Sequence, residues 1–313
     1  MRIVFMGSAE LSCCSLVALH ELSWAEVVGV VCQPDRPQGR RLELKSCPVK
    51  ACTADSGVPV LTPQNVNSTR ALEQISALRP DAIAVVAYGQ ILRRALLDVA
   101  PMGCVNVHTS LLPAYRGAAP IQWAIANGEQ ESGVTTMQVN EAMDEGDILL
   151  QERVAINDDD TAGRLHDRLA TVGAALLVRT LDGLKDGSIV PRPQDQDAAT
   201  YAPKLSKRDG RLDWSQPALR LRNRIRGFNP WPACSCELPD KPETVLRVLD
   251  SRIAAGNAHA APGDVLGADE SGPVIQCGEK ALCLTEVQPQ GGRRMTGSAY
   301  LRGHPLPAGL RLA

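Results

Sequence analysis

Asn106 and His108 are the first candidates for chemistry in this sequence of 313 residues, because they stand two positions apart at the end of a short apolar run. In an extended strand, side chains two residues apart project from the same face of the sheet. A side-chain amide and an imidazole held side by side can donate hydrogen bonds to one oxygen on which negative charge develops. The spacing therefore predicts a site that stabilises an oxyanion.

A carboxylate that can partner His108 is found in the segment Met143-Asp-Glu-Gly-Asp147. Asp144 in this segment would orient the imidazole and help to collect a proton from an attacking group. The same residues also have plainer interpretations. His108 can be a structural hydrogen-bonding residue, Asn106 a turn residue, and the two aspartates a solvated loop or a helix cap.

The stretches around this pair predict a parallel sheet wrapped by helices, because short apolar runs alternate with segments of helical periodicity. Strands are expected at Arg2–Phe5, Glu26–Cys32, Val58–Leu61, Ala82–Ala87, Cys104–His108, Gly133–Val139 and Ile148–Ile156. Helices are expected at Glu10–Leu22, Pro48–Ser56, Ser68–Leu78, Arg93–Val99, Pro120–Asn127 and Thr161–Lys185. Open sheets bind ligands at the carboxyl ends of their strands. This rule selects the loops after Phe5, Cys32, Ala87 and His108.

Residues 187–203 are rich in Pro, Asp and Gln and lack periodicity, which is the composition of a linker. Beyond it we expect an amphipathic helix and short strands, at Gln216–Gly227, Thr244–Ala254, Asp264–Leu266, Pro273–Cys277 and Ala281–Gln288. Short strands separated by turn residues indicate a small β-barrel of the oligonucleotide-binding type. The chain is thus predicted to be an α/β protein. A Rossmann-like catalytic domain with an open, mostly parallel sheet would occupy residues 1–186, and the barrel residues 204–313.

The composition is typical of a soluble globular protein, with 44% hydrophobic and 22% charged residues. No apolar run approaches the roughly 18 residues that a membrane helix needs, and the first residues predict a strand rather than a signal peptide. Ten scattered cysteines without framework spacing predict reduced thiols. Cys234 and Cys236 are too close for the usual zinc knuckle, so no metal is expected. We therefore expect a cytoplasmic protein, and separately we expect it to be monomeric.

The formal net charge of −2 hides an asymmetry between the two halves of the chain. Residues 204–313 hold 16 Lys and Arg against 11 Asp and Glu, a net charge of +5, whereas residues 1–203 hold 17 against 24, a net charge of −7. A basic second half can meet a polyanion such as nucleic acid. An excess of this size is also compatible with an ordinary solvated surface.

The stretch from Asn106 to Pro120 reads Asn-Val-His-Thr-Ser-Leu-Leu-Pro-Ala-Tyr-Arg-Gly-Ala-Ala-Pro and resembles the folate-dependent formyltransferase family. Active sites of that family combine an Asn-x-His pair, a Ser-Leu-Leu-Pro segment and a downstream Asp. Within the family, the resemblance is to members that act on methionyl-tRNA, and it extends over nearly the whole chain. The further segments that carry it are Met1–Gly7, Gln33–Arg40, Arg116–Ile121, Tyr201–Lys207, Asp213–Trp214 and Arg226–Pro232.

The resemblance implies that Asn106, His108 and Asp144 form the catalytic group and that 10-formyltetrahydrofolate is the formyl donor. The residues that it implies for the folate site are Ser110, Leu111, Leu112, Pro113, Tyr88, Gly89, Leu92 and Asn140. In the implied reaction the methionyl amine attacks the formyl carbon. Asn106 and His108 stabilise the oxyanion, and Asp144 supports His108 and proton transfer. No metal, nucleotide or covalent enzyme intermediate is required.

The implied acceptor is the initiator methionyl-tRNA. Residues 34–45 form a long, basic connection that we expect to contact the acceptor stem, although a mobile surface loop is the plainer interpretation. The family commonly has Gly-Arg-Gly-Lys-Lys here, whereas Leu42 and Glu43 interrupt the cations of this sequence. The residues expected to bind the RNA are Arg36, Arg40, Arg41, Lys45, Lys207, Arg222, Arg226, Arg293 and Arg294. Arginines of the second domain can instead be solvated or salt-bridged.

Other functions are also compatible with the sequence. A formyltransferase that acts on a sugar nucleotide or a purine precursor would share the catalytic group but would not need a basic second domain. A folate-binding hydrolase would use water in place of the amine and release formate without an acceptor. A dinucleotide-binding domain joined to an RNA-binding module would fit the architecture, but the loop after Gly7 lacks the Gly-x-Gly-x-x-Gly spacing that approaches a pyrophosphate.

Overall fold

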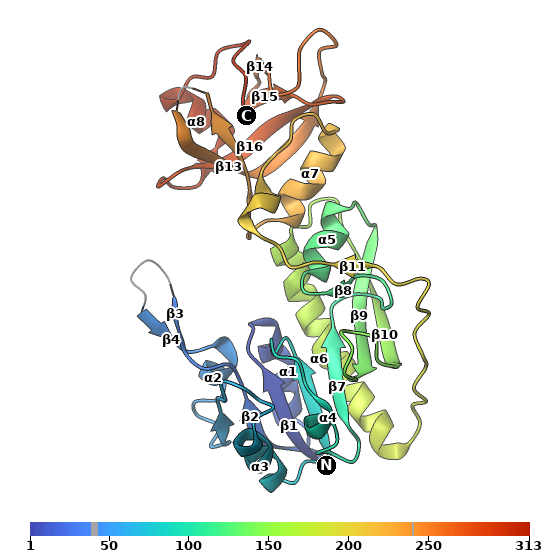
Figure 1. Ribbon diagram of the computed structural model, residues 1–313. Helices are drawn as coiled ribbons and strands as arrows, with labels where there is room; N and C mark the ends of the chain where they lie inside the picture. The colour runs from blue at the N-terminus through green and yellow to red at the C-terminus, as the bar shows by residue number, and fades with distance from the viewer. Residues whose placement is uncertain (39–42, 240) are drawn as a thin grey trace. The chain divides into compact units, whose positions relative to one another are not determined.

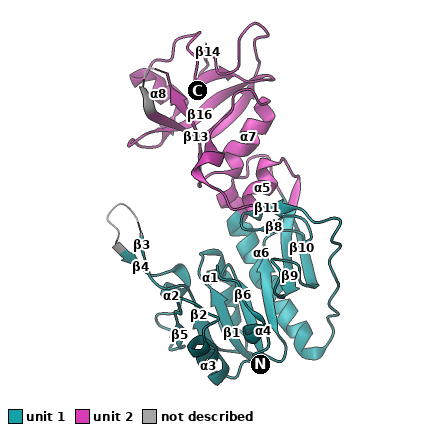
Figure 2. Ribbon diagram, viewed as in Figure 1, with its two compact units in different colours: residues 1–120, 132–155, 166–202 teal, residues 121–131, 156–165, 203–313 magenta. Residues whose placement is uncertain are grey.

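The computed structural model describes residues 1–38, 43–239 and 241–313 (Figure 1). The described chain divides into two compact units (Figure 2). Unit 1 comprises residues 1–120, 132–155 and 166–202, and unit 2 comprises residues 121–131, 156–165 and 203–313. Two short segments of the first half of the chain therefore belong with the C-terminal residues.

Unit 1 is built on a sheet whose described part has seven strands, in the order β10-β9-β7-β6-β1-β2-β5. The strands are β1 (Arg2–Gly7), β2 (Glu26–Val31), β5 (Val60–Leu61), β6 (Ala82–Val86), β7 (Cys104–His108), β9 (Glu131–Gln138) and β10 (Ile148–Ala155). Neighbours from β5 to β7 are parallel, and β9 runs antiparallel to β7. The chain moves outward from β1 to β5 and returns beside β1 as β6. This reversal creates a switch point, where open sheets bind ligands.

Helices cover both faces of this sheet. They are α1 (Leu11–His20), α2 (Pro48–Cys52), α3 (Thr69–Ala77), α4 (Arg94–Leu97) and α6 (Ala162–Asp186), whereas α5 (Pro120–Ala126) falls almost entirely in unit 2. Local chemistry explains where some of them begin. Pro48 occupies the first position of α2, where its missing N–H costs nothing, and the Ser68 side chain caps α3 by accepting a hydrogen bond from Ala71 N–H.

The two faces of β7 have different neighbours. Cys104 packs in one buried cluster with Ile75 of α3 and Leu96 of α4. On the other face α6 comes so close that a Cβ added at Gly173 would lie 3.0 Å from Val107 Cγ1. Because side chains alternate along a strand, Asn106 and His108 share the face of Cys104, away from α6.

Unit 2 contains a mainly antiparallel sheet of six described strands in the order β12-β13-β16-β15-β14, with β17 on β16. Its elements are η1 (Lys207–Gly210), α7 (Ala218–Gly227), β12 (Cys234–Leu238), β13 (Lys241–Ala254), β14 (Val265–Ala268), β15 (Pro273–Gln276), β16 (Ala281–Pro289), β17 (Met295–Thr296) and α8 (Gly297–Gly303). The apolar face of α7 is buried, and Trp123 of α5 meets Phe228 edge to face at 5.5 Å. This contact explains why α5 belongs to unit 2.

The predicted fold class is confirmed: a Rossmann-like α/β part precedes a strand-rich antiparallel part. Every strand and helix expected for the sheet is present, with ends that shift by a few residues. Elements that were not predicted are the hairpin of β3 (Arg36–Gln38) and β4 (Glu43–Lys45), the pair β8 (Arg116–Gly117) and β11 (Tyr201–Ala202), and η1, β12, β17 and α8. Most of these are too short to show a periodic pattern. In the part of the chain that the model describes, no helix is long and apolar enough to span a membrane.

Candidate active site

Asn106 and His108 stand at the carboxyl end of β7, between β6 and β9. Asn106 is half-buried, and within the described residues no protein group forms a hydrogen bond with its carboxamide. The His108 ring is buried, and its Nε2 lies 2.9 Å from the carbonyl oxygen of Tyr115. Because a carbonyl oxygen only accepts hydrogen bonds, Nε2 must donate. Nδ1 is therefore the ring nitrogen left for other partners.

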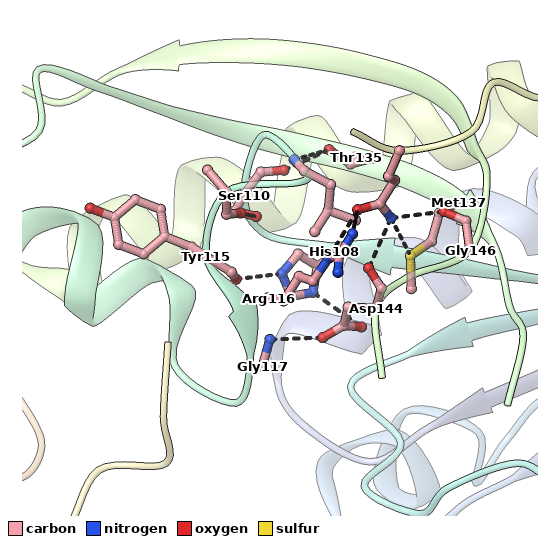
Figure 3. A network of polar contacts seen from close by, with 12 residues as sticks. His108, Ser110, Tyr115, Arg116, Gly117, Thr135, Met137, Asp144 and Gly146 are labelled. Atoms are coloured by element: carbon pink, nitrogen blue, oxygen red, sulfur yellow. Dashed lines mark hydrogen bonds and ion pairs between the residues drawn. The ribbon is translucent and has the colours of Figure 1, made fainter. Parts of the chain in front are cut away.

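Asp144, in the loop between β9 and β10, contacts both His108 and the chain that follows β7 (Figure 3). Its Oδ1 lies 3.7 Å from His108 Nδ1, and its Oδ2 accepts a hydrogen bond of 2.9 Å from Gly117 N–H. The side chains of His108 and Asp144 are only 7% and 15% exposed, so water screens their interaction weakly. The structure thus brings these two sequence-predicted residues together at the end of the strand that carries Asn106.

The turn after β7 is fastened to β9 through Thr135. Thr135 Oγ1 accepts a hydrogen bond from Leu112 N–H at 3.0 Å and donates one to the Ser110 carbonyl oxygen at 2.7 Å. The Ser110 hydroxyl donates to the Ala114 carbonyl oxygen at 2.6 Å, and the Leu112 side chain is buried. These two side chains therefore build the turn. The other residues of the predicted folate segment, Leu111 and Pro113, are half-buried.

The remaining residues predicted for folate lie on the loops after β6 and β9. Tyr88 and Leu92 are buried in the apolar core of unit 1, and burial raises the pKa of the Tyr88 phenol. The Tyr88 carbonyl oxygen accepts hydrogen bonds from Ser8 Oγ at 3.2 Å and Gln33 Nε2 at 3.3 Å. These bonds join the loops after β1, β2 and β6. The exposed members of the predicted set are Gly89 and Asn140.

A buried polar network beside Asp144 was not predicted. The Arg116 guanidinium is 1% exposed and donates to the side chains of Gln194 and Gln196, which belong to the expected linker. Arg116 could have been identified from the sequence as a residue of the site, because it lies in a segment that carries the family resemblance. A glutamine in a polar, aperiodic stretch carries no such signal, because nothing local distinguishes it from its neighbours.

Two of the cations predicted to contact RNA face each other on the hairpin β3–β4. Arg36 and Lys45 are directly opposite across the two strands, and both side chains are exposed. Like charges in this arrangement destabilise a strand pair, and a bound anion would relieve the repulsion. Arg40 and Arg41 lie outside the described residues.

Arg226, also predicted to contact RNA, lies in the interior of unit 2. Its side chain is 8% exposed and donates to the carbonyl oxygens of Asn157 at 3.0 Å and Asp160 at 3.4 Å. Burial lowers the pKa of its guanidinium, and the neighbouring Arg222 acts in the same direction. A guanidinium enclosed in this way does not reach a phosphate, so we leave Arg226 out of the RNA-contacting set.

The other predicted cations of unit 2 lie nearer its surface. Lys207 and Arg293 are exposed. Arg294 is exposed but forms an ion pair with Glu286, and Arg222 donates to the carbonyl oxygen of Asp158 at 2.8 Å. A phosphate would have to compete with these partners at Arg222 and Arg294, whereas at Lys207 no carboxylate of the described residues forms an ion pair.

The thiols and acidic groups form no ligand cluster in the described residues, where no group of three or more His, Cys, Asp or Glu side chains is placed to hold a metal ion. All ten cysteines fall within the described residues as free thiols, and seven of them are buried. Burial raises the pKa of both Cys234 and Cys236 to about 12, so these side chains are neutral thiols packed in the core.

A family model described as formyl transferase matches residues 1–181, and a model of the formyl transferase C-terminal domain matches residues 204–305. The methionyl-tRNA formyltransferase of Desulfotalea psychrophila is 47% identical over 308 residues, which cover 98% of this chain and 94% of that protein. The methionyl-tRNA formyltransferase of Trichlorobacter lovleyi is 44% identical over 311 residues, covering 99% and 96%.

Among solved structures, the chain has the fold of the N-formyltransferase from Helicobacter canadensis, which was crystallised with folinic acid and dTDP-3-aminofucose. The two structures give a TM-score of 0.65 with 18% sequence identity, over 90% of this chain and 98% of the other. Identity at that level establishes the fold alone. The two family models and the curated relatives go further, and they show that this chain belongs to the formyl transferase family.

Proposed function

We propose that this protein transfers the formyl group of 10-formyltetrahydrofolate to the free amino group of methionine on the initiator methionyl-tRNA. The product, formyl-methionyl-tRNA, would serve translation initiation. The names of the curated relatives support this choice of substrate. The structural observation that carries the proposal is the largely buried pair of His108 and Asp144 at the end of the strand that carries Asn106, whose carboxamide has no protein partner among the described residues.

The proton released by the attacking amine has a defined acceptor in the proposed reaction. His108 Nε2 already donates to the Tyr115 carbonyl oxygen, so Nδ1 is the ring nitrogen that exchanges a proton. Asp144 Oδ1 lies 3.7 Å from that nitrogen, while Oδ2 is anchored by Gly117 N–H. We assign the His108–Asp144 pair to accept this proton as the amine attacks and to return it to the departing folate nitrogen when the bond between that nitrogen and the formyl carbon breaks, which is general acid–base catalysis.

Asn106 is assigned to the oxygen that gains negative charge. The folate donor, when bound, supplies a formyl group that is already activated as an amide. A primary carboxamide offers two N–H donors, and those of Asn106 have no protein acceptor among the described residues. A donor that is preorganised toward a developing oxyanion lowers the barrier. His108 can contribute a second donor only through Nδ1, since Nε2 is used by Tyr115.

The loops at this edge of the sheet expose apolar side chains that we expect to contact the flat faces of the folate donor. Ile91, after β6, and Met143, after β9, are 66% and 60% exposed. Exposed apolar side chains beside convergent polar groups are typical of ligand sites. We propose that the folate site comprises all the residues expected from the sequence, which are Ser110, Leu111, Leu112, Pro113, Tyr88, Gly89, Leu92 and Asn140.

We further propose that residues 204–313 bind the tRNA and that the hairpin β3–β4 meets its acceptor stem. The net charge of +5 over residues 204–313 supports the first part. The opposed Arg36 and Lys45 support the second, because a phosphate between them would remove their repulsion. The described residues proposed to contact RNA are Arg36, Lys45, Lys207, Arg222, Arg293 and Arg294. A role in translation implies a cytosolic protein, and we propose in addition that it is monomeric.

The proposal is tested by mixing the purified protein with 10-formyltetrahydrofolate and methionyl initiator tRNA and measuring formyl-methionine on the RNA. We expect formylation that depends on both substrates. Formate release at the same rate with and without tRNA would identify a hydrolase instead. Formylation of an amino-sugar nucleotide or an aminated purine precursor, with none on the tRNA, would place the protein in another branch of the family.

A further inference from the structure

Residues 192–202, part of the segment expected to be a linker, run along the active-site loops as a strap. Backbone hydrogen bonds join Arg192 to Ile148, Thr200 to Arg116, and Ala202 to Ala118. Between these attachments one side chain turns inward: Gln194 is buried, whereas both of its neighbours are exposed. A buried polar side chain in a surface strap needs partners, and those of Gln194 lie in the loop that carries Asp144.

Gln194 uses both ends of its carboxamide. Its Oε1 accepts hydrogen bonds from Arg116 Nε at 3.1 Å and from the Arg116 terminal nitrogen at 2.7 Å. Its Nε2 donates to the carbonyl oxygens of Asp144 and Gly146, each at 2.8 Å. The orientation of this amide is decided by chemistry, because a guanidinium offers only donors and a carbonyl oxygen offers only lone pairs. Reversing the amide would lose all four contacts.

The loop that Gln194 holds needs external support. Asp144 has a positive φ of 56°, a left-handed conformation that a non-glycine residue keeps only when its surroundings enforce it. The two carbonyl oxygens bound by Nε2 flank Glu145, so Gln194 clamps the backbone on both sides of that residue. Glu145 itself approaches Arg116 at 3.5 Å, which adds a second link to the same guanidinium.

We propose that Gln194 is a positioning residue that sets the Asp144 carboxylate against His108. The inference rests on the proposed function, since it concerns the proton step assigned to that pair. Among the described residues, Gln194 forms no hydrogen bond with the His108 ring or with the Asp144 carboxylate, and it acts through the backbone carbonyl oxygen of Asp144. Misplacing a catalytic group by about an ångström costs on the order of 100-fold in rate, which is the scale of effect available to such a clamp.

Two variants separate the two ends of the amide. Gln194→Leu removes both sets of hydrogen bonds at similar volume. Gln194→Glu keeps an acceptor for Arg116 but turns a carboxylate oxygen toward the carbonyl oxygens of Asp144 and Gly146. We expect both variants to lower kcat by about 10- to 100-fold. KM for the tRNA and for the folate should stay within about twofold, because no substrate contact is removed.

Gln196→Leu is the matched control. Gln196 lies on the same strap and binds the same guanidinium, to which its Oε1 offers an acceptor at 2.9 Å, but it is exposed and contacts neither Asp144 nor Gly146. Its kcat should stay within about threefold of the unsubstituted protein. An equal loss in Gln196→Leu and Gln194→Leu would mean that Arg116, and not the Asp144 loop, is what the strap supports. That result would overturn the proposal.

A double-mutant cycle with Asp144→Asn, measured as kcat, is the decisive experiment. If Gln194 acts through the Asp144 carboxylate, the protein with both Gln194→Leu and Asp144→Asn should be no more than about twofold slower than Asp144→Asn alone, because coupled residues are not additive. If the loss of kcat in the doubly substituted protein equals the product of the two single losses, Gln194 acts independently of the Asp144 carboxylate. That result would overturn the inference. A Gln194→Glu protein that has lost its native circular dichroism would also overturn it, by making Gln194 a folding residue. Absence of formylation in the unsubstituted protein would refute the proposed function itself, and so is distinguishable from these outcomes.

Discussion

His108 Nδ1 lies 3.7 Å from Asp144 Oδ1, while the opposite ring nitrogen donates to the Tyr115 carbonyl oxygen at 2.9 Å. The first separation exceeds the roughly 2.7–3.2 Å of an N–H···O hydrogen bond, and catalytic contacts often tighten only when substrate binds. Because Tyr115 occupies Nε2, the ring cannot turn to offer both nitrogens to substrates without losing this hydrogen bond. The pair is therefore arranged to move a proton at one defined atom.

Substituting either member of this pair should abolish most of the turnover while leaving the fold intact. We expect His108→Ala and Asp144→Asn each to lower kcat by about 100-fold or more, as measured by formylation of methionyl-tRNA. Glu141→Gln removes an exposed carboxylate from the same loop and serves as the control, with kcat within about twofold. Undiminished turnover in His108→Ala would remove this residue from the mechanism.

Asn106 should show a loss of rate without a loss of stability. Asn106→Ala removes the proposed oxyanion donor and should lower kcat by about 100- to 1,000-fold. Its free energy of unfolding in urea should change by less than about 1 kcal/mol, because the carboxamide has no protein partner among the described residues. Asn106→Asp keeps the size of the side chain but repels an oxyanion, so it should not restore activity. Recovery of turnover in Asn106→Asp would contradict the assigned role.

The hairpin β3–β4 should be separable from folding. Replacing both Arg36 and Lys45 by Ala should weaken tRNA binding and reduce the dependence of log Kd on log salt by about one unit per lost phosphate contact. Stability should change by less than about 0.5 kcal/mol, because both side chains are exposed and repel each other. Arg94→Ala, which removes an exposed arginine paired with Asp98, is the control. An unchanged salt dependence would show that another element contacts the acceptor stem.

Arg226 and Arg220 stand on the same helix and should behave in opposite ways. Arg226→Ala leaves the carbonyl oxygens of Asn157 and Asp160 without their buried donor and should cost about 2–3 kcal/mol of stability. Arg220 is exposed and hydrogen-bonded only locally, to Gln216, so Arg220→Ala should change stability by less than about 0.5 kcal/mol. Urea unfolding of both variants measures the difference. Equal losses of unfolding free energy in the two variants would mean that the buried hydrogen bonds of Arg226 do not stabilise the fold.

The periodic parts of the fold were predictable because their signals are local. The strand Cys104–His108 was predicted with the bounds that the structure has, since an apolar run ends there in two polar residues two apart. The hairpin β3–β4 was missed, because strands of three residues in a charged, Pro-containing segment show no alternation. The strand β12 was missed as well, although its buried Cys234 and Cys236 do alternate with half-buried residues. Free cysteine behaves as a small apolar residue, so the spacing of Cys234 and Cys236 is the local signal that this strand carries.

The sequence by itself determined the α/β class, the carboxyl end of β7 as the place of the site, and the identity of Asn106, His108 and Asp144 as candidates. These follow from residue periodicity and from side-chain chemistry at short spacing. Only the tertiary structure decided which nitrogen of His108 faces Asp144, that Arg226 is enclosed, and that Gln194 holds the loop. Arg116 and Gln194 are 78 residues apart, so their contact depends on the path of the whole chain between them. Burial and pairing over such distances have no local signal, because they arise only when separate segments exclude water together.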